Sequence, residues 1–348
     1  MKFKRNGSLN RITSHDVAEL AGVSQSTVSR VLNTNKDNGF ISKETADRVR
    51  AAANELGYSP NPIARALRGE KTNMIGLVVR EIADPFFAGL IEIICSKARQ
   101  LNYNVILGHV HSDPAEELNL VRILDSRQCD GIIFVGDLKN DQQVLQSYLS
   151  EKHPVVALCR GRMVNSLPTI NCNNQAGIKQ IIDYLVNLGH RRLTFIDGGW
   201  IGDIFERREV FLEYKNEFAD GKQFNWLQAE NNNPEGGYKA MRQLLKDTPR
   251  PTAVLASDDS MAIGVIKAVL EAGLRIPEDI SVTGFDDIDF VKYITPSLTT
   301  VRQPIDAMAN KAIDILFSQI EGKEDPRKSI LIELEPDLVI RNSTGPVP

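Results

Sequence analysis

Long hydrophobic runs are missing from this sequence of 348 residues, and so is a secretory leader. No stretch of about 18 apolar residues occurs, so the sequence predicts no transmembrane helix. The opening residues MKFKRNGSLNR contain no apolar segment of the kind that a signal peptide carries. We therefore expect a cytoplasmic protein with no membrane partner. The length suits two or three domains, and the 42% hydrophobic and 25% charged residues are typical of a globular protein.

Cysteine pairs and catalytic motifs are also lacking. The four cysteines are widely spaced in apolar surroundings without a CxxC pair, so we expect small buried side chains rather than disulfides or a zinc site. They are Cys95, Cys129, Cys159 and Cys172. His109 and His111, at i and i+2 of a predicted strand, are the one hint of a metal, and they have no third ligand. Without a phosphate-binding loop, a G-x-S-x-G motif or a clear catalytic constellation, we expect no metal, no cofactor and no enzyme.

Three groups of apolar residues at helical spacing predict three short helices within residues 1–58, sharing one small core. Start signals agree with this prediction. Thr13 and Asp16 form a T-x-x-D capping box, and Ser24 and Ser42 can cap the second and third helices. Gly22 ends the first helix and permits a sharp turn before the second, as in a helix-turn-helix.

This N-terminal head differs in charge from the rest of the chain. Residues 1–71 hold 12 Lys and Arg and 7 Asp and Glu, a net of +5, whereas residues 72–348 hold 29 and 38, a net of −9. The second helix opens with SQST at 24–27, which buries almost nothing and offers hydrogen-bonding side chains outward. A basic, polar head on an acidic body favours a polyanion as the partner of the head.

From about residue 73, short apolar runs alternate with amphipathic helices. This alternation predicts right-handed βαβ units and parallel sheets, and about ten strands favour two doubly wound lobes over one sheet. Ligands of such folds bind at the carboxyl ends of the strands. Between head and body, Asn61 and Pro62 favour the start of a two-turn helix that would be marginal alone and is expected to fold against a partner.

Several motifs, taken in this order and spacing, resemble the LacI/GalR (lactose/galactose/purine repressor) family of bacterial transcription regulators. They are DVAELAGVSQSTVSRVLN, ELGYSPNPIARALR, IGLVV with ADPFFAGL, CDGIIFVG, LGHRRLTFIDG, ASDDSMAIGVIKAVLEAGLRIPEDISVTGFDD and PSLTTVRQP. The resemblance runs from end to end of the chain.

The resemblance implies the fold and the domains. The fold class is α/β: a three-helix helix-turn-helix head with a hinge helix, joined to a two-lobed, doubly wound body like that of periplasmic binding proteins. We expect the DNA-binding domain at 1–58, the hinge at 59–72, and an effector-binding and dimerisation body at 73–348. Within the body, the N-lobe is expected at about 73–171 and 303–332, and the C-lobe at about 172–302 and 333–348.

In this family the second helix of the head lies in the major groove, where side chains near its start reach base edges. The resemblance implies that Gln25, Ser26 and Arg30 read bases, because Gln can bond adenine and Arg can bond guanine with two hydrogen bonds. Gln25 and Ser26 have an alternative as solvated helix-start residues. Phosphate contacts, which fix register only, are implied for Thr13, Ser24, Thr27, Ser29, Asn33 and Tyr58. The loop TNKDNGFI departs from the family by about three extra residues.

The hinge is also expected on the DNA. Leu67 matches the family's minor-groove lever, an apolar side chain pushed between base pairs to kink the duplex, and Arg65 lies beside it in the sequence. Packing of Leu67 between two hinge helices is an alternative that is compatible with this role.

For the body, the resemblance implies a sugar or sugar derivative as effector, held in the cleft between the lobes. Such ligands need carboxylates, amides and Arg for paired hydrogen bonds and an aromatic face for the ring. The candidates are Asp84, Phe86, Phe87, Asn173, Trp200, Arg207, Asp258 and Asp286. Asp258 has a structural alternative as a helix cap, whereas ligand contact is favoured for Arg207 and Asp286.

Departures from the family leave the effector's identity open. Asn173 stands where the family usually has Asp, and Asn232 falls where several members carry a stacking aromatic. Ile201 and Asp203 occupy positions that read polar groups in the purine-binding member, which disfavours a purine. Trp200 could supply the aromatic face, and a core or rim position for it is equally consistent.

We therefore predict a DNA-binding regulator, expected to be a repressor, that binds a palindromic operator as a homodimer and responds to a sugar-like effector. The C-terminal residues LVIRNSTGPVP lack the apolar heptads of a tetramerising coiled coil. An alternative is a two-lobed enzyme acting on sugars, with Asp258 or Asp286 as general base. A transport-type binding protein is disfavoured by the missing signal peptide and the extra head.

Overall fold

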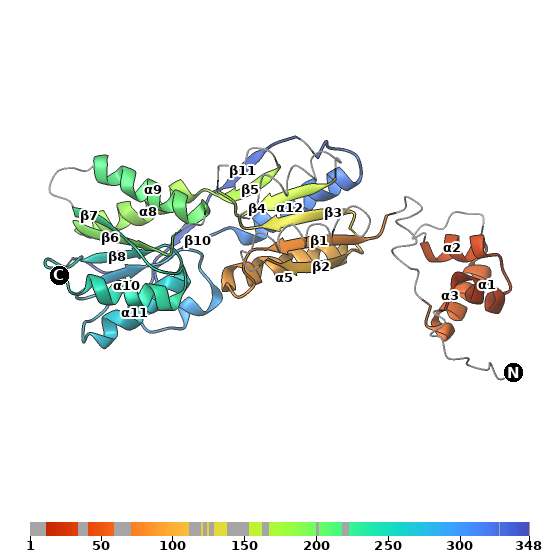
Figure 1. Ribbon diagram of the computed structural model, residues 1–348, viewed down its shortest axis with the longest axis horizontal. Helices are drawn as coiled ribbons and strands as arrows, with labels where there is room; N and C mark the ends of the chain where they lie inside the picture. Colours follow the sequence, from red (N-terminus) through yellow and green to blue (C-terminus); the bar gives the residue numbers. More distant parts are fainter. Residues whose placement is uncertain are drawn as a thin grey trace. The chain divides into compact units, whose positions relative to one another are not determined.

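The computed structural model describes residues 12–33, 41–58, 71–110, 120, 124, 129–137, 153–161, 167–199, 202–217, 223–326 and 328–347. The chain divides into two compact units, a head of residues 1–72 and a body of residues 73–348 (Figure 1). The head has a hydrophobic core of its own, separate from the two cores of the body.

The head contains the three expected helices: α1 (Ser14–Ala21), α2 (Gln25–Asn33) and α3 (Lys43–Leu56). Val17, Val28 and Val49, one from each helix, are buried at the centre of its core. The predicted capping box is present, with the amide of Thr13 donating to the Asp16 carboxylate at 2.7 Å. Local hydrogen bonds therefore fix where α1 begins, and burial of one apolar stripe per helix holds the three together.

The N-lobe of the body contains a six-stranded sheet in the order β11-β5-β4-β3-β1-β2, in which all neighbouring strands are parallel. Alternate residues of β1 enter two different cores: Leu77 packs in the larger cluster and Val78 in the smaller one on the other face. Burial on both faces explains why these strands read as continuous apolar runs. The elements are β1 (Met74–Val79), α5 (Pro85–Gln100), β2 (Asn104–His109), β3 (Gly131–Val135), β4 (Val155–Leu158), β5 (Thr169–Cys172), α12 (Ile305–Ile320) and β11 (Leu331–Leu334).

The C-lobe contains a four-stranded parallel sheet in the order β7-β6-β8-β9. Figure 1 shows α8 and α9 on one side of this sheet and α10 and α11 on the other. The elements are α8 (Asn174–Asn187), β6 (Arg192–Asp197), α9 (Gly202–Glu217), β7 (Gln223–Gln228), α10 (Pro234–Leu244), β8 (Ala253–Ala256), α11 (Asp259–Glu271), β9 (Ser281–Thr283) and the 3₁₀ turn η1 (Asp289–Lys292).

The chain passes between the lobes after β5, after β10 (Thr300–Arg302) and after β11. Strand β10 pairs with β12 (Asp337–Val339) in a short antiparallel sheet beside these crossings. The last described residues pack on the C-lobe, where buried His190 bonds the Thr252 hydroxyl and the Gly345 carbonyl, each at 3.0 Å. Three connecting segments of the chain thus join the lobes, an arrangement that permits the lobes to move relative to each other.

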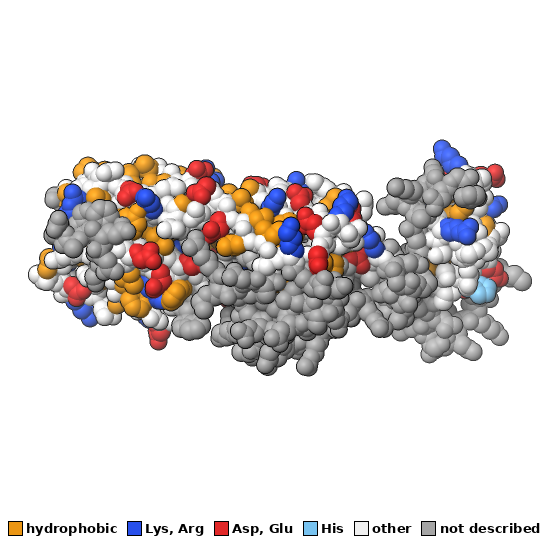
Figure 2. Space-filling model, turned by 90° about the horizontal axis from the view of Figure 1, so that it is seen from above, with side chains coloured by type: hydrophobic (Ala, Val, Ile, Leu, Met, Phe, Trp, Pro, Cys, Tyr) orange, Lys and Arg blue, Asp and Glu red, His pale blue; other side chains and the backbone are white. Residues whose placement is uncertain are grey.

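No helix in the described ranges is long and apolar enough to cross a membrane. The same residues contain no group of three His, Cys, Asp or Glu side chains placed to hold a metal, and His111 lies outside them. The four cysteines are free; three are buried, as predicted, and Cys95 is only partly buried. On the face drawn in Figure 2, acidic and basic side chains are interspersed over the described part of the body.

Candidate functional site

The first candidate surface is the start of α2 in the head. Ser24 caps the helix by accepting the Thr27 amide at 3.2 Å, and it is itself exposed. Gln25, Ser26 and Arg30 are all exposed, while Val28 on the opposite side is buried. The proposed base-reading side chains therefore project from a helix that is anchored by its apolar face.

The other DNA candidates differ in their surroundings. Thr13 is exposed beside Asp16, and Thr27 and Ser29 are half-buried on α2. Tyr58 is half-buried and packs against the head core. The side chain of Asn33 and the whole of Arg65 and Leu67 lie outside the described residues, as do residues 34–40 of the long loop.

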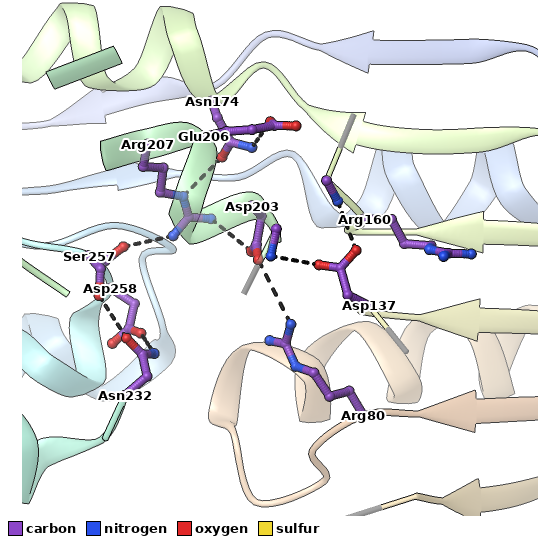
Figure 3. Close-up of polar contacts among 12 residues, drawn as sticks. Arg80, Asp137, Arg160, Asn174, Asp203, Glu206, Arg207, Asn232, Ser257 and Asp258 are labelled. Carbon is purple, nitrogen blue, oxygen red and sulfur yellow. Dashed lines mark hydrogen bonds and ion pairs between the residues drawn. The ribbon is translucent and has the colours of Figure 1, made fainter. Parts of the chain in front are cut away.

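The second candidate site centres on Arg207, which α9 carries into the body with a side chain only 2% exposed. Its Nε donates to Asn174 Oδ1 at 2.9 Å, and its Nη1 donates to the Ser257 carbonyl at 2.8 Å (Figure 3). The guanidinium also lies 3.7 Å from the centre of the Phe285 ring. These contacts fix its orientation, leaving Nη2 directed at two carboxylates, Asp203 at 3.4 Å and Asp286 at 3.5 Å.

Asp286 lies just after β9 and is buried against Arg207. Gln303 donates to its Oδ1 at 2.6 Å from the crossing segment after β10. Burial raises the pKa of the Asp286 carboxyl well above its usual value, while the charge of Arg207 opposes that rise. Its φ of 116° is rare for a residue with a side chain, so backbone strain is stored beside this ion pair.

Asp258 is a helix cap that also bonds a neighbouring side chain. Its Oδ1 accepts the Met261 amide at 2.8 Å and so caps α11, while Oδ2 accepts the side-chain amide of Asn232. Asn232 in turn accepts the Ser257 hydroxyl at 2.9 Å. Burial raises the pKa of Asp258, and the amide bonds from Met261 and Asn232 oppose the rise. Asp258 is thus a cap in fact, and a contact with an effector stays a prediction.

On the N-lobe, Asp84 caps α5 by accepting the Phe86 amide at 3.0 Å, and its side chain remains partly exposed. Burial, followed by the nearby charge of Asp258 on the other lobe, raises the pKa of Asp84 to about 6. The charge of a C-lobe carboxylate therefore acts on an N-lobe carboxylate, and each lies after a strand of its own parallel sheet.

The remaining effector candidates are Phe86, Phe87, Asn173 and Trp200. Phe86 and Phe87 are 6% and 1% exposed and belong to the N-lobe core, with their ring centres 5.4 Å apart. Asn173 caps α8 and donates to Glu335 at 2.8 Å. Trp200 lies outside the described residues. Effector contacts of these four residues stay predictions.

Several residues that sequence reasoning did not select complete the site: Arg80, Asp137, Asn174, Asp203, Ser257 and Gln303. Arg80 directly follows β1, and Asp137 comes two residues after β3, so the rule that polar residues after strands line the ligand edge could have found them. The same rule could have found Asn174, which comes two residues after β5. Gln303 follows β10, which pairs antiparallel with β12, so the rule for parallel strands gives no signal for it.

Comparison with known proteins identifies the family. Residues 13–61 match the family model of bacterial regulatory proteins of the lacI family, and residues 182–344 match a periplasmic binding protein-like domain. The PurR transcriptional repressors of Pectobacterium atrosepticum and Klebsiella pneumoniae are each 34% identical, over 97% of this chain and 98% of theirs.

Solved structures agree with these relatives. The lac repressor dimer bound to operator and the anti-inducer ONPF gives a TM-score of 0.84 at 27% identity, covering 97% of this chain and all of that one. A complex of the regulator CelR with cellobiose gives 0.69 at 28% identity, covering 96% of this chain and all of that one. The chain therefore belongs to the lacI family of bacterial regulatory proteins, and it is a DNA-binding transcriptional repressor rather than an enzyme.

Proposed function

We propose that this repressor binds a palindromic operator as a homodimer in the cytoplasm, under the control of a small sugar-like effector held between the lobes of the body. The observation that carries the proposal is full-length likeness to an operator-bound lac repressor, covering head and body together. Because one chain carries both an exposed helix start in the head and a buried polar site in the body, ligand binding at one can be coupled to DNA binding at the other.

In the head, Gln25, Ser26 and Arg30 are the proposed base readers, supported by their exposure on α2. Thr13, Ser24, Thr27, Ser29, Asn33 and Tyr58 are the proposed phosphate contacts. In the hinge, Leu67 and Arg65 are proposed to meet the minor groove. In-vitro selection of DNA by the full chain should return an inverted repeat whose half-sites match a two-fold dimer. Recovery of a single, non-repeated site would contradict the dimeric proposal.

In the body, Asp84, Arg207, Asp258 and Asp286 supply the carboxylates and guanidinium that a polyhydroxy ligand needs. Three neighbours support this ligand class: the lac repressor bound to ONPG, CelR with cellobiose, and an Enterococcus faecium regulator with ribose. Their identities to this chain are 27%, 28% and 26%. The expectation that a purine is disfavoured stays a prediction.

A dimer is supported by exposed apolar side chains near η1. Tyr293 is 78% exposed and Phe290, three residues earlier, is 43% exposed. Large exposed aromatics are costly in water and are enriched at interfaces between proteins. Sedimentation of the full chain should give a dimer, and changing Tyr293 to Ser should weaken it. A stable tetramer would contradict the proposal.

Thermal-shift screening of the full chain against sugars, polyols and sugar phosphates tests the effector class. A ligand present at about 100 times its Kd should add about 2.7 kcal/mol to the free energy of unfolding. A hit should be lost in the Arg207→Met variant, judged against that variant's own melting temperature without ligand. Turnover of a sugar by the full chain would instead favour an enzyme, contrary to the repressor assignment.

A further inference from the structure

The two lobes touch through backbone at a pair of glycines. Gly161 follows β4 in the N-lobe, and Gly202 is the first residue of α9 in the C-lobe. A Cβ added to Gly161 would lie 2.8 Å from the Gly202 Cα, and one added to Gly202 would lie 2.8 Å from the Gly161 Cα. Neither glycine has φ in the left-handed region, so close approach of the lobes, rather than backbone conformation, requires glycine at both positions.

One carboxylate bonds both of these glycines. Asp137, two residues after β3, accepts the Gly161 amide with Oδ1 at 3.0 Å and the Gly202 amide with Oδ2 at 2.9 Å. The Gly202 amide is among the first of α9 and has no partner within the helix. A carboxylate at this helix N-terminus also interacts favourably with the helix dipole. Figure 3 shows Asp137, on the N-lobe, directed at α9.

A second N-lobe side chain meets the next residue of α9. Arg80, which directly follows β1, lies 3.8 Å from Asp203, and both side chains are mostly buried. The facing atoms, Arg80 Nη1 and Asp203 Oδ1, have no hydrogen bond to any other described residue. Asp203 also contacts Arg207, one turn further along the same helix, at 3.4 Å. The position of the first turn of α9 therefore sets the positions of the Asp203 carboxylate and the Arg207 guanidinium.

We propose that Asp137 is a positioning residue of the cleft: by bonding Gly161 and Gly202 together it fixes the first turn of α9 against the N-lobe and places Asp203 and Arg207 for the effector. The role of the cleft rests on the proposed function. The bond between the lobes is a property of the protein without effector, so it can be tested separately. Asn cannot replace Asp137 in this role, because both carboxylate oxygens accept a glycine amide and Asn would turn its own N–H₂ toward one of those two amides.

Hydrogen–deuterium exchange of the full chain without ligand, read by mass spectrometry, tests the proposal. Asp137→Asn should speed exchange in residues 202–211 by about tenfold, as expected when a hydrogen bond to a charged group is lost. Asp130→Asn is the matched control. Asp130 precedes the same strand at its other end, and its carboxylate accepts the Asn73 amide at 2.8 Å. This control should leave exchange in residues 202–211 unchanged.

A second variant acts without altering any charge. Gly161→Ala leaves Asp137 intact and adds a methyl group that pushes Gly202 away, so it should reproduce the faster exchange of α9. Gly161→Ala also tests the proposal if the Asp137→Asn variant does not fold. Wild-type exchange of residues 202–211 in either folded variant would overturn the proposal, as would equally fast exchange throughout the C-lobe, including residues 253–283. A negative sugar screen would count only against the effector assignment.

Discussion

Changing Asp84 to Asn should stabilise the protein at neutral pH while leaving it nearly unchanged in acid. In the folded body the pKa of Asp84 is raised from 3.8 to about 6, by burial and by the charge of Asp258. Asn is about as good a helix N-cap as Asp, so the bond to the Phe86 amide at the start of α5 can be kept. The substitution therefore removes the charge and keeps the local structure.

The size of the effect follows from the pKa difference. A rise from 3.8 to about 6 corresponds to about 3 kcal/mol, at about 1.36 kcal/mol for each pKa unit. Because the Asp84 side chain remains partly exposed, screening by solvent should reduce this to about 1–2 kcal/mol. The unfolded chain loses the proton near pH 4 and the folded protein keeps it to about pH 6, so the penalty grows with pH across this window and is constant above about pH 7.

Urea unfolding of wild type and Asp84→Asn at pH 4.5 and pH 7.5 measures this difference. The variant should gain about 1–2 kcal/mol at pH 7.5 and about a third of that at pH 4.5. Asp130→Asn serves as a control, because that carboxyl lies at the opposite end of the N-lobe sheet. An equal difference at both pH values, or a loss of stability at pH 7.5, would show that the pKa of Asp84 is not raised in the folded protein and would refute the reasoning.

Three further predictions concern other sites. Arg207→Met should lower the free energy of unfolding by about 3–5 kcal/mol at pH 8, because Asp286 stays buried without its cation, and by less at pH 5. Equal losses at the two pH values in urea titrations would contradict this. Burial lowers the pKa of His190 in the folded protein, so its contribution to stability should be present above about pH 6.5 and lost as pH falls from there through the pKa of the folded state. An imidazole pKa above 6.5, measured by NMR in the folded protein, would contradict this. Arg30→Ala should weaken operator binding by about 1–3 kcal/mol and relax one base pair per half-site, measured by anisotropy; an equal loss on random DNA would make Arg30 a phosphate contact.

The helix starts of the head were predictable because the determining contacts are local. Ser24 and Ser42 each accept an amide three residues ahead, at Thr27 and Thr45, so the cap and its partner are visible in one short stretch of sequence. Gly22 has a φ of 65°, which few other residues adopt, and this made the turn before α2 readable as well.

The cleft was predictable only in part, because its geometry depends on contacts between distant residues. The rule that ligands bind after parallel strands selected Asp84, Asp258 and Asp286 correctly as residues at that edge. Asn173 was selected from the family resemblance; the structure uses it as the cap of α8 and directs the neighbouring Asn174 at Arg207. The sequence did not show that the start of α8 would use the Asn173 side chain, because that use depends on where the helix begins.

The influence of the Asp258 charge on Asp84 across the lobes indicates how an effector would act. Burial raises the pKa of Asp84 on the N-lobe, and the charge of Asp258 on the C-lobe adds to that rise, a repulsion that grows as the lobes approach. A ligand whose hydroxyl groups donate to both carboxylates would remove this cost only when both lobes contact it, so it would bind the closed body more tightly than an open one. Because burial is the larger cause of the raised pKa and the Asp84 side chain is partly exposed, the repulsion contributes less than about 2 kcal/mol, or less than about 30-fold in the ratio of the two states. A neutral polyhydroxy ligand can supply this difference, whereas an anionic group placed between the same two carboxylates would increase the repulsion and favour opening.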